Sequence, residues 1–241
     1  MKKVIFVADL HIDIGETKRL QAFEKFLATE QAPIYIMGDL FNFWAGNAQG
    51  NLGYVRHFLR FLRRICAKKQ IFFLAGNRDF LFVPFFAKRL KGNTIEDGYT
   101  LTLGKHRVVL YHGDALCTGD KSYLEMKKWL QSDLIYYISR FMPSNVCVKI
   151  GQKFRQTSQK AIRKKAQKDM GLNFQFILDI LDDLNQDVMI CGHTHKPQFK
   201  VLREEKDNDK ELYVLPECKE QCISYLEWSD NQFTYKEKNY D

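Results

Sequence analysis

The stretch VIFVADLH, residues 4–11, shows most directly what kind of fold this chain adopts. Its first five residues are apolar and include β-branched side chains, a pattern typical of a short buried strand. Asp9 and His11 follow where that strand would end. The same arrangement recurs along the chain, with apolar runs stopped by loops rich in Gly, Asp, Asn and His, so the sequence predicts several buried strands that end in polar loops.

The first half of the chain alternates predicted strands and helices. Further strands are expected at 33–37 and 71–75, and helical periodicity covers 19–29 and 54–67 between them. A β-α-β-α-β order favours a largely parallel sheet covered by helices. The later part of the chain is predicted to contain a short helix, a hairpin and further strands, at 82–90, 100–103, 107–111, 188–191, 198–203, 211–215, 223–228 and 232–236.

These elements predict an α/β protein of the α+β type, built from two stacked mixed sheets flanked by helices. With 241 residues, 45% of them hydrophobic, the chain is long enough for one domain with a substantial core. We expect a single domain over residues 1–241 with a helical insertion at about 120–170.

Composition limits where the protein works and what it binds. No secretory signal or run long enough to span a bilayer is evident, so we expect a cytoplasmic protein with six reduced cysteines. The net charge is +8, and residues 149–168 contain eight Lys or Arg and no acidic residue. This uneven charge predicts an anionic partner, either a phosphorylated substrate, an acidic membrane surface or a nucleic acid.

Five loops contain the candidate site residues. Because ligands of open α/β sheets bind beyond the carboxyl ends of the strands, these loops can converge on one crevice. Any one of them taken alone is more simply an ordinary polar loop, but five in order favour a shared site. The loops are Asp9-Leu10-His11, Gly38-Asp39, Gly76-Asn77-Arg78-Asp79, His112-Gly113-Asp114 and Gly192-His193-Thr194-His195.

The residue types in these loops suit a pair of divalent cations. Two metal ions about 4 Å apart need a mixture of carboxylate, imidazole and neutral oxygen ligands. Asp39 is a single carboxylate whose two oxygens can bridge two ions, and Asn77 supplies a neutral oxygen. Nitrogen ligands are available from His11, His112, His193 and His195, and a further carboxylate from Asp9.

In this order the motifs Asp-x-His, Gly-Asp, Gly-Asn-x-Asp, His-Gly-Asp and Gly-His-Thr-His resemble those of the calcineurin-like metallophosphoesterases, over residues 9–195. The resemblance implies a β-sandwich of two mixed sheets with flanking helices and two divalent ions, most typically Mn²⁺. It also implies the ligand sets. Asp9, His11 and His195 would hold one ion and Asn77, His112 and His193 the other, with Asp39 bridging.

Arg78 is informative about the substrate. Most members of the family have His at this position of the Gly-Asn-x-Asp motif, where it can act as a general acid. Arginine does not give up a proton near neutral pH, but it pairs well with phosphate oxygens. Arg78 therefore favours a leaving group that needs no proton, such as the phosphate released when a pyrophosphate is cleaved. The alternative is an arginine that is only solvated.

Longer versions of four motifs, at 38–44, 76–81, 112–120 and 192–197, resemble the UDP-2,3-diacylglucosamine diphosphatase branch of the family. This resemblance implies hydrolysis by water attack on the α-phosphorus, giving UMP and 2,3-diacylglucosamine 1-phosphate, or lipid X, in lipid A biosynthesis. Catalytic roles would fall to Asn77, Arg78 and His193. The implied substrate contacts are Asn77, Arg78, Asp120, Ser158, Lys165 and His193. The chain departs from the branch at Ile162, where Asn is usual, and at Leu-Pro-Glu-Cys-Lys, 215–219.

The composition of the predicted insertion suits a helical lid over an acylated substrate, which the family resemblance implies. Residues 130–148 are rich in large apolar side chains, and the basic stretch follows them. Apolar residues next to basic ones suit an acylated anion taken from a membrane surface, so we expect peripheral attachment to the inner face of a bacterial inner membrane. The alternative is a core helix followed by a solvated charged face.

Two other functions remain open at this point. The enzyme could be a metallophosphoesterase for another phosphodiester, a nucleotide or a phosphomonoester. A nucleic-acid-binding module is a third possibility, which predicts strongly salt-dependent binding that survives loss of Asp39.

Overall fold

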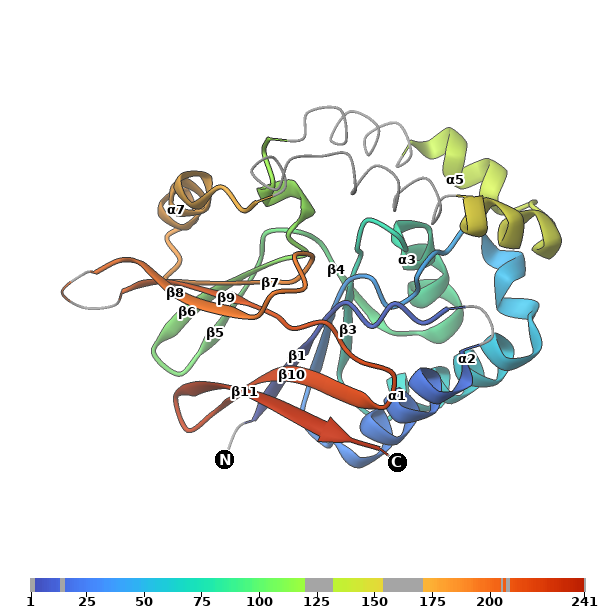
Figure 1. Ribbon diagram of the computed structural model, residues 1–241, viewed down its shortest axis with the longest axis horizontal. Helices are drawn as coiled ribbons and strands as arrows, with labels where there is room; N and C mark the ends of the chain where they lie inside the picture. Colours follow the sequence, from blue (N-terminus) through green and yellow to red (C-terminus); the bar gives the residue numbers. More distant parts are fainter. Residues whose placement is uncertain are drawn as a thin grey trace.

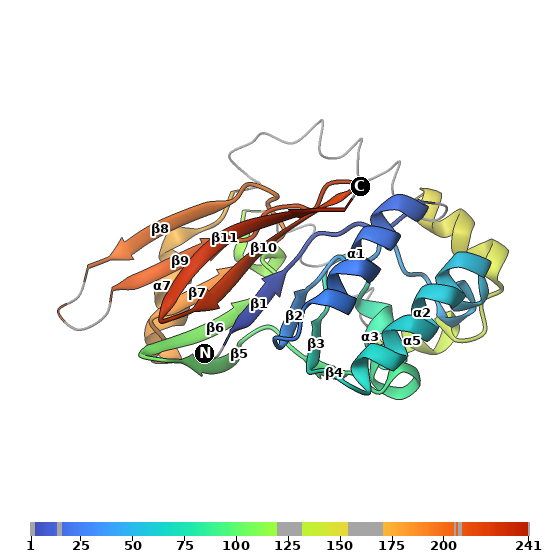
Figure 2. The same ribbon diagram turned by 90° about the horizontal axis from the view of Figure 1, so that it is seen from below.

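A computed structural model describes residues 3–13, 16–119, 132–153, 171–204, 206 and 209–240. Two β-sheets lie face to face, with α1 (Thr17–Thr29) and α2 (Gly53–Cys66) on one outer side (Figure 1). The helix α7 (Phe174–Asp183) lies on the other outer side, as Figure 2 also shows. The expected fold class, two mixed sheets flanked by helices, is confirmed.

The first sheet is mainly parallel. Its strand order is β11-β10-β1-β2-β3-β4. The four strands β1 to β4 run parallel, whereas β10 pairs antiparallel with both β1 and β11. The bounds are β1 Val4–Val7, β2 Ile34–Met37, β3 Ile71–Leu74, β4 Asn93–Ile95, β10 Cys222–Ser229 and β11 Gln232–Asn239.

The second sheet has a parallel centre and antiparallel edges. Its order is β5-β6-β7-β9-β8, in which β6, β7 and β9 are parallel. The outer strands β5 and β8 pair antiparallel with β6 and β9. The bounds are β5 Tyr99–Leu103, β6 His106–Tyr111, β7 Val188–Cys191, β8 Gln198–Arg203 and β9 Lys210–Val214.

Alternating side chains of the strands divide the core into layers. In β1, Ile5 and Val7 face α1 and α2, while Phe6 belongs to the cluster between the two sheets. In β7, Ile190 faces the first sheet and Met189 packs with residues of α7. Because both faces of the central strands are buried, these strands are continuous apolar runs, as the sequence shows.

Two short segments differ from the predicted elements. The strand β4 was not predicted, because only Ile95 of its three residues is buried and no apolar alternation marks it. The segment predicted as one helix over 82–90 is irregular. It consists of a 3-10 turn at Phe80–Phe82, α3 at Val83–Phe85 and a π-turn at Phe86–Leu90. Further 3-10 turns lie at Asn47–Asn51 and Asp114–Leu116.

Of the residues predicted to form an insertion, the structure describes 132–153. They contain α5 (Asp133–Ser139) and a helical segment at 144–153, and the rest of residues 120–170 lies outside the described residues. These helices pack against the loop that follows β2. The contact is so close that a Cβ on Gly46 would clash with the carbonyl oxygen of Ser139. In the part of the chain that is described, no helix is both long and apolar enough to cross a membrane.

Candidate metal centre

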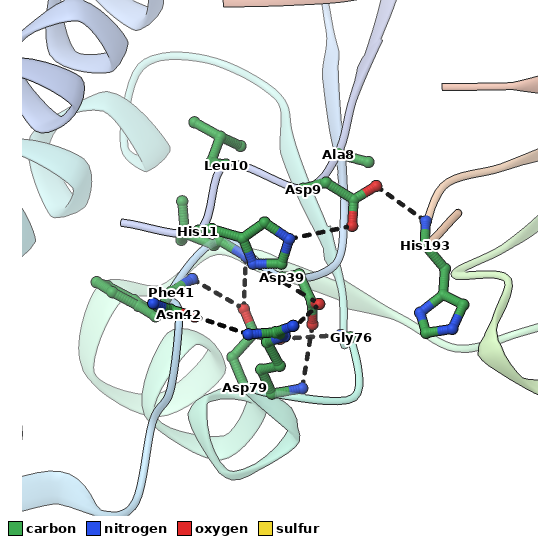
Figure 3. A network of polar contacts seen from close by, with 12 residues as sticks. Ala8, Asp9, Leu10, His11, Asp39, Phe41, Asn42, Gly76, Asp79 and His193 are labelled. Carbon is green, nitrogen blue, oxygen red and sulfur yellow. Dashed lines mark hydrogen bonds and ion pairs between the residues drawn. The ribbon is translucent and has the colours of Figure 1, made fainter. Parts of the chain in front are cut away.

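The predicted site loops meet at one edge of the sandwich. In the first sheet, β1, β2 and β3 are parallel, and the loops with Asp9, Asp39 and Asn77 follow their ends. In the second sheet, β6 and β7 are parallel and lead into the loops with His112 and His193. The site is therefore built from both sheets. Figure 3 shows Asp9, Asp39 and His193 converging from these separate segments.

Several candidate ligands have an unusual backbone conformation. Asp9, His11, Asp39, His193 and His195 have φ angles of 52°, 48°, 52°, 69° and 60°. Ordinary residues avoid this left-handed region, which costs on the order of 1 kcal/mol for each of them, and such residues gather at functional sites. The conformation is held by backbone hydrogen bonds. The His11 N–H donates to the Asp39 carbonyl (2.8 Å), and the Asp9 N–H donates to the Gly38 carbonyl (3.1 Å).

Gly38 explains why the loops can approach so closely. Its φ is +92°, and a Cβ there would clash with Nδ1 of His112 and lie 2.8 Å from the backbone of Gly76. Only glycine meets both requirements, because it adopts a positive φ readily and has no side chain. The close contact lets the loops after β2, β3 and β6 share one small volume.

The first group of candidate ligands is Asp9, His11 and His195. The Nε2 atoms of the two histidines are 3.1 Å apart. Asp9 Oδ1 lies 3.7 Å from Nε2 of His11 and 3.5 Å from Nε2 of His195. Three ligand atoms from two sheets thus face one another within the reach of a single cation.

The second group centres on Asp39 and His112. The Nδ1–H of His112 donates to the Met37 carbonyl (2.9 Å), so in the neutral ring the lone pair is on Nε2. That Nε2 lies 3.8 Å from Asp39 Oδ1. Asp9 joins this group as well. The carboxylate of Asp39 also lies 3.9 Å from Nδ1 of His11, which places it between the two groups, as a bridging ligand requires.

Asn77 and His193 lie next to the second group. The carboxamide of Asn77 has one atom 2.8 Å from Asp39 Oδ2 and 3.1 Å from Oδ1. As nitrogen this atom donates to the carboxylate, and as oxygen it adds a neutral ligand beside it. The ring of His193 is 5.3 Å from that of His112, and its backbone N–H donates to Asp9 Oδ2 (2.9 Å).

The chemistry of these side chains fits divalent cations. Asp9 Oδ1, His11 Nδ1 and His112 Nε2 are buried and have no hydrogen-bond partner. Buried polar atoms without partners are costly and call for an explanation such as a bound ion. Carboxylate, amide and imidazole donors together suit ions such as Mn²⁺ or Zn²⁺. Divalent ions would satisfy these atoms, and the seven predicted ligands are the residues that would hold them.

Burial and mutual charge shift the pKa values of these groups. Burial raises the pKa of Asp39 to about 6, although the nearby His112 opposes this. For His112, burial lowers the pKa, but Asp39, Asp114 and Asp9 outweigh it and raise the pKa to about 9. Without a cation, the second group therefore holds a proton on His112 at neutral pH.

Two other histidines are kept neutral. Burial, with the positive charge of Arg78 as the next cause, lowers the pKa of His11 to about 2. Burial and the charge on His112 lower the pKa of His193 to about 3. Neutral imidazole is the form that binds a metal, so these two rings are ready to do so without losing a proton.

Arg78 lies at the edge of the site. Its Nε is 3.4 Å from Asp39 Oδ2, and its Nη1 donates to Asn42 Oδ1 (2.7 Å). Its side chain is 22% exposed, so it is partly covered rather than only solvated. The position suits an arginine that binds a substrate oxyanion next to the candidate ions.

Three residues with clear roles at this site were not assigned from the sequence. Asp79 is fully buried and accepts hydrogen bonds from the backbone N–H groups of Leu40 (2.7 Å) and Gly76 (2.9 Å), which joins the loops after β2 and β3. It is the last residue of Gly-Asn-x-Asp, so the motif contained the signal. Asn42 and Glu217 contact Arg78 and His195, and no local sequence pattern marks them.

The remaining sequence predictions have different outcomes. Asp120, Ser158 and Lys165, with Ile162, lie outside the described residues, so their substrate roles stay predictions. Trp44, the last residue of the motif at 38–44, is a packing residue, because it is fully buried against Phe41 and Phe82. The six cysteines are free thiols.

Comparison with known proteins agrees with this geometry. The sequence pattern of the calcineurin-like phosphoesterases matches residues 2–197. A UDP-2,3-diacylglucosamine hydrolase of Shewanella piezotolerans is 33% identical over 229 residues, covering 92% of this chain and 94% of that protein. The enzyme of the same name from Proteus mirabilis is 32% identical over 202 residues, covering 82% and 84%. The chain belongs to the calcineurin-like phosphoesterase family.

Proposed function

We propose that the protein hydrolyses the pyrophosphate bond of UDP-2,3-diacylglucosamine and releases UMP and 2,3-diacylglucosamine 1-phosphate. The observation that carries this proposal is the convergence of candidate ligands from five loops around Asp9 and Asp39, with Arg78 beside them. Relatives that are 32–33% identical over most of their length carry the name of this activity. Membership of the phosphoesterase family makes the protein a hydrolase that uses divalent metal ions.

The proposed ligand sets follow the two groups in the structure. Asp9, His11 and His195 would hold one ion and Asn77, His112 and His193 the other, with Asp39 shared. We propose Mn²⁺, which accepts this mixture of oxygen and nitrogen donors. Two such ions supply Lewis acidity and a reactive water at neutral pH. The chain's own contribution is to hold neutral imidazoles and carboxylates in place.

Arg78 would bind a phosphate oxygen of the substrate. Nη1 donates to Asn42 and Nε forms an ion pair with Asp39, so these two contacts orient the guanidinium plane and leave Nη2 for the substrate. In the reaction a bond forms between the water oxygen and the α-phosphorus, and the bond from that phosphorus to the bridging oxygen breaks. The departing sugar phosphate leaves as an oxyanion, so no general acid is required at this position. Asn77 and His193 complete the proposed catalytic set.

The visible part of the insertion supports a lipid substrate. Leu134, Tyr137 and Phe141 on and after α5 are 65%, 61% and 69% exposed, and Lys149 and Lys153 follow on the next helical segment. Exposed apolar side chains next to basic ones favour contact with acyl chains and anionic lipid headgroups. We propose that residues 120–170 form the lid of a single-domain enzyme, peripheral to the cytoplasmic face of the bacterial inner membrane.

A direct assay tests this function. The purified protein with Mn²⁺ and UDP-2,3-diacylglucosamine should release UMP and the sugar 1-phosphate in equal amounts, detected by chromatography and mass spectrometry. In ¹⁸O-labelled water the label should appear in UMP, because the α-phosphorus is attacked. Activity on soluble phosphodiesters without any release of UMP would contradict the proposal, and so would label found only in the lipid product.

A further inference from the structure

We propose that Glu217 is a positioning residue that orients His195 and strengthens the hold on the ion bound by Asp9, His11 and His195. The inference rests on the proposed role of His195 as a metal ligand. Glu217 lies in the stretch 215–219, where the sequence departs from the motifs that carry the resemblance. This stretch therefore supplies a carboxylate that contacts a candidate ligand of the metal centre.

The hydrogen bond is at the correct atom of the ring. His195 Nδ1 lies 3.1 Å from Glu217 Oε2, and a carboxylate can only accept, so Nδ1 carries the proton. The free lone pair is then on Nε2, which faces Asp9 Oδ1 at 3.5 Å and His11 Nε2 at 3.1 Å. A carboxylate bonded to the outer nitrogen of a ligand histidine fixes its tautomer and raises its basicity.

The segment around Glu217 is anchored on both sides. The Leu215 N–H donates to the carbonyl of Cys191 (2.7 Å), which is the last residue of β7 and lies two positions before His193. The Cys218 N–H donates to the carbonyl of Asp9 (3.3 Å), itself a candidate ligand. Glu217 therefore lies between fixed points on both sheets, even though its side chain is 43% exposed. Its carboxylate is held where His195 needs it.

The ring of His195 is less restricted by its surroundings than the ring of His112. The side chain of His112 is completely buried, and a backbone carbonyl accepts its Nδ1 proton. The side chain of His195 is 32% exposed, and its backbone is in the left-handed region with φ +60°. Packing restricts the ring of His195 less than that of His112. Glu217 therefore accepts the Nδ1 proton of His195, as the Met37 carbonyl does for His112.

The test measures metal binding without substrate. Metal-free protein is titrated with Mn²⁺ by calorimetry for wild type, E217L, E217Q and the control E220L. Glu220 is an exposed carboxylate of the same loop, so its loss changes the net charge equally. We expect E217L to weaken one of two binding steps by about 10- to 100-fold and to leave the other unchanged. E217Q, which keeps an oxygen acceptor but no charge, should lie between wild type and E217L, and E220L should match wild type.

A second cycle separates positioning from a general effect of charge or folding. In an H195A background, removing the Glu217 carboxylate should change the Mn²⁺ affinity no further. An equal additional loss in that background would overturn the proposal, as would a wild-type isotherm for E217Q. The isotherm of E217Q therefore tests the proposal even if E217L does not fold. These readouts do not depend on the substrate, so failure of the proposed hydrolase activity would leave them unaffected.

Discussion

Replacing Asp39 with Asn should make the metal-free protein more stable, although it removes the carboxylate proposed to bridge two ions. Asp39 is almost completely buried, and its pKa of about 6 lies well above the ordinary value of 3.8 because burial disfavours the charged form. The charged carboxylate therefore destabilises the fold. Asn has nearly the same shape, carries no charge and can still accept the hydrogen bond that the Arg78 N–H donates to Oδ1 (3.0 Å).

The size and the sign of the effect follow from the two pKa values. Because the folded chain binds this proton more tightly than the unfolded chain, deprotonation lowers the free energy of unfolding as the pH rises. A pKa near 6 instead of 3.8 corresponds to up to about 3 kcal/mol when the group is fully charged. About half of this difference should be present at pH 5 and all of it above pH 7.

Urea unfolding in EDTA at pH 5 and pH 8 measures this difference. We expect Asp39→Asn to have the higher free energy of unfolding, with a larger gap at pH 8. The control Asp183→Asn, at an exposed position of α7, should match wild type. With Mn²⁺ at 100 times its Kd, wild type should gain about 2.7 kcal/mol and the Asn variant much less. A variant that is less stable than wild type in EDTA at pH 8, or a gap independent of pH, would refute the reasoning.

Three further outcomes are expected. Arg78→Ala should keep its bound metal but lose about 10²-fold or more in kcat. Arg78→Lys should be similarly slow, because lysine has no planar group of donors that can bond Asn42 and the substrate together; metal analysis and kinetics check both variants. The Kd for Mn²⁺ should rise by up to about tenfold for each pH unit below 9, because the ion must displace the proton that His112 holds. A Kd that does not change between pH 6.5 and 8.5 would contradict this. Leu134→Ser with Phe141→Ser should reduce cosedimentation with anionic phospholipid vesicles, whereas Leu184→Ser, an exposed apolar residue after α7, should not; equal loss in both would rule out a specific role for α5.

Much of the fold and the membership of the site followed from local sequence patterns. The central strands are buried on both faces, so β1 and β2 appear as uninterrupted apolar runs, and their ends mark where polar loops begin. Since parallel strands end at one edge, the sequence alone leads to the expectation that Asp9 and Asp39 meet. The structure brings these candidate ligands together, while their roles in binding metal remain predictions.

Contacts between distant loops could not be predicted in the same way. The hydrogen bond from Arg78 to Asn42 joins residues 36 positions apart, and that from His195 to Glu217 joins residues 22 apart. No periodicity or spacing rule links such pairs, because each depends on how two loops fold over the end of a sheet. Asn42 was an unassigned position within a longer motif, and Glu217 belonged to a stretch noted only because it departs from the family.

The left-handed backbone at the candidate ligands implies a conflict between catalysis and durability. At Asp9, His11, Asp39, His193 and His195 together, the strained backbone costs the folded chain several kcal/mol. Substitutions that relieve this strain would remove candidate ligands and leave the strands of both sheets unchanged. Stability gained at these positions in the metal-free chain would therefore be gained at the expense of ion binding.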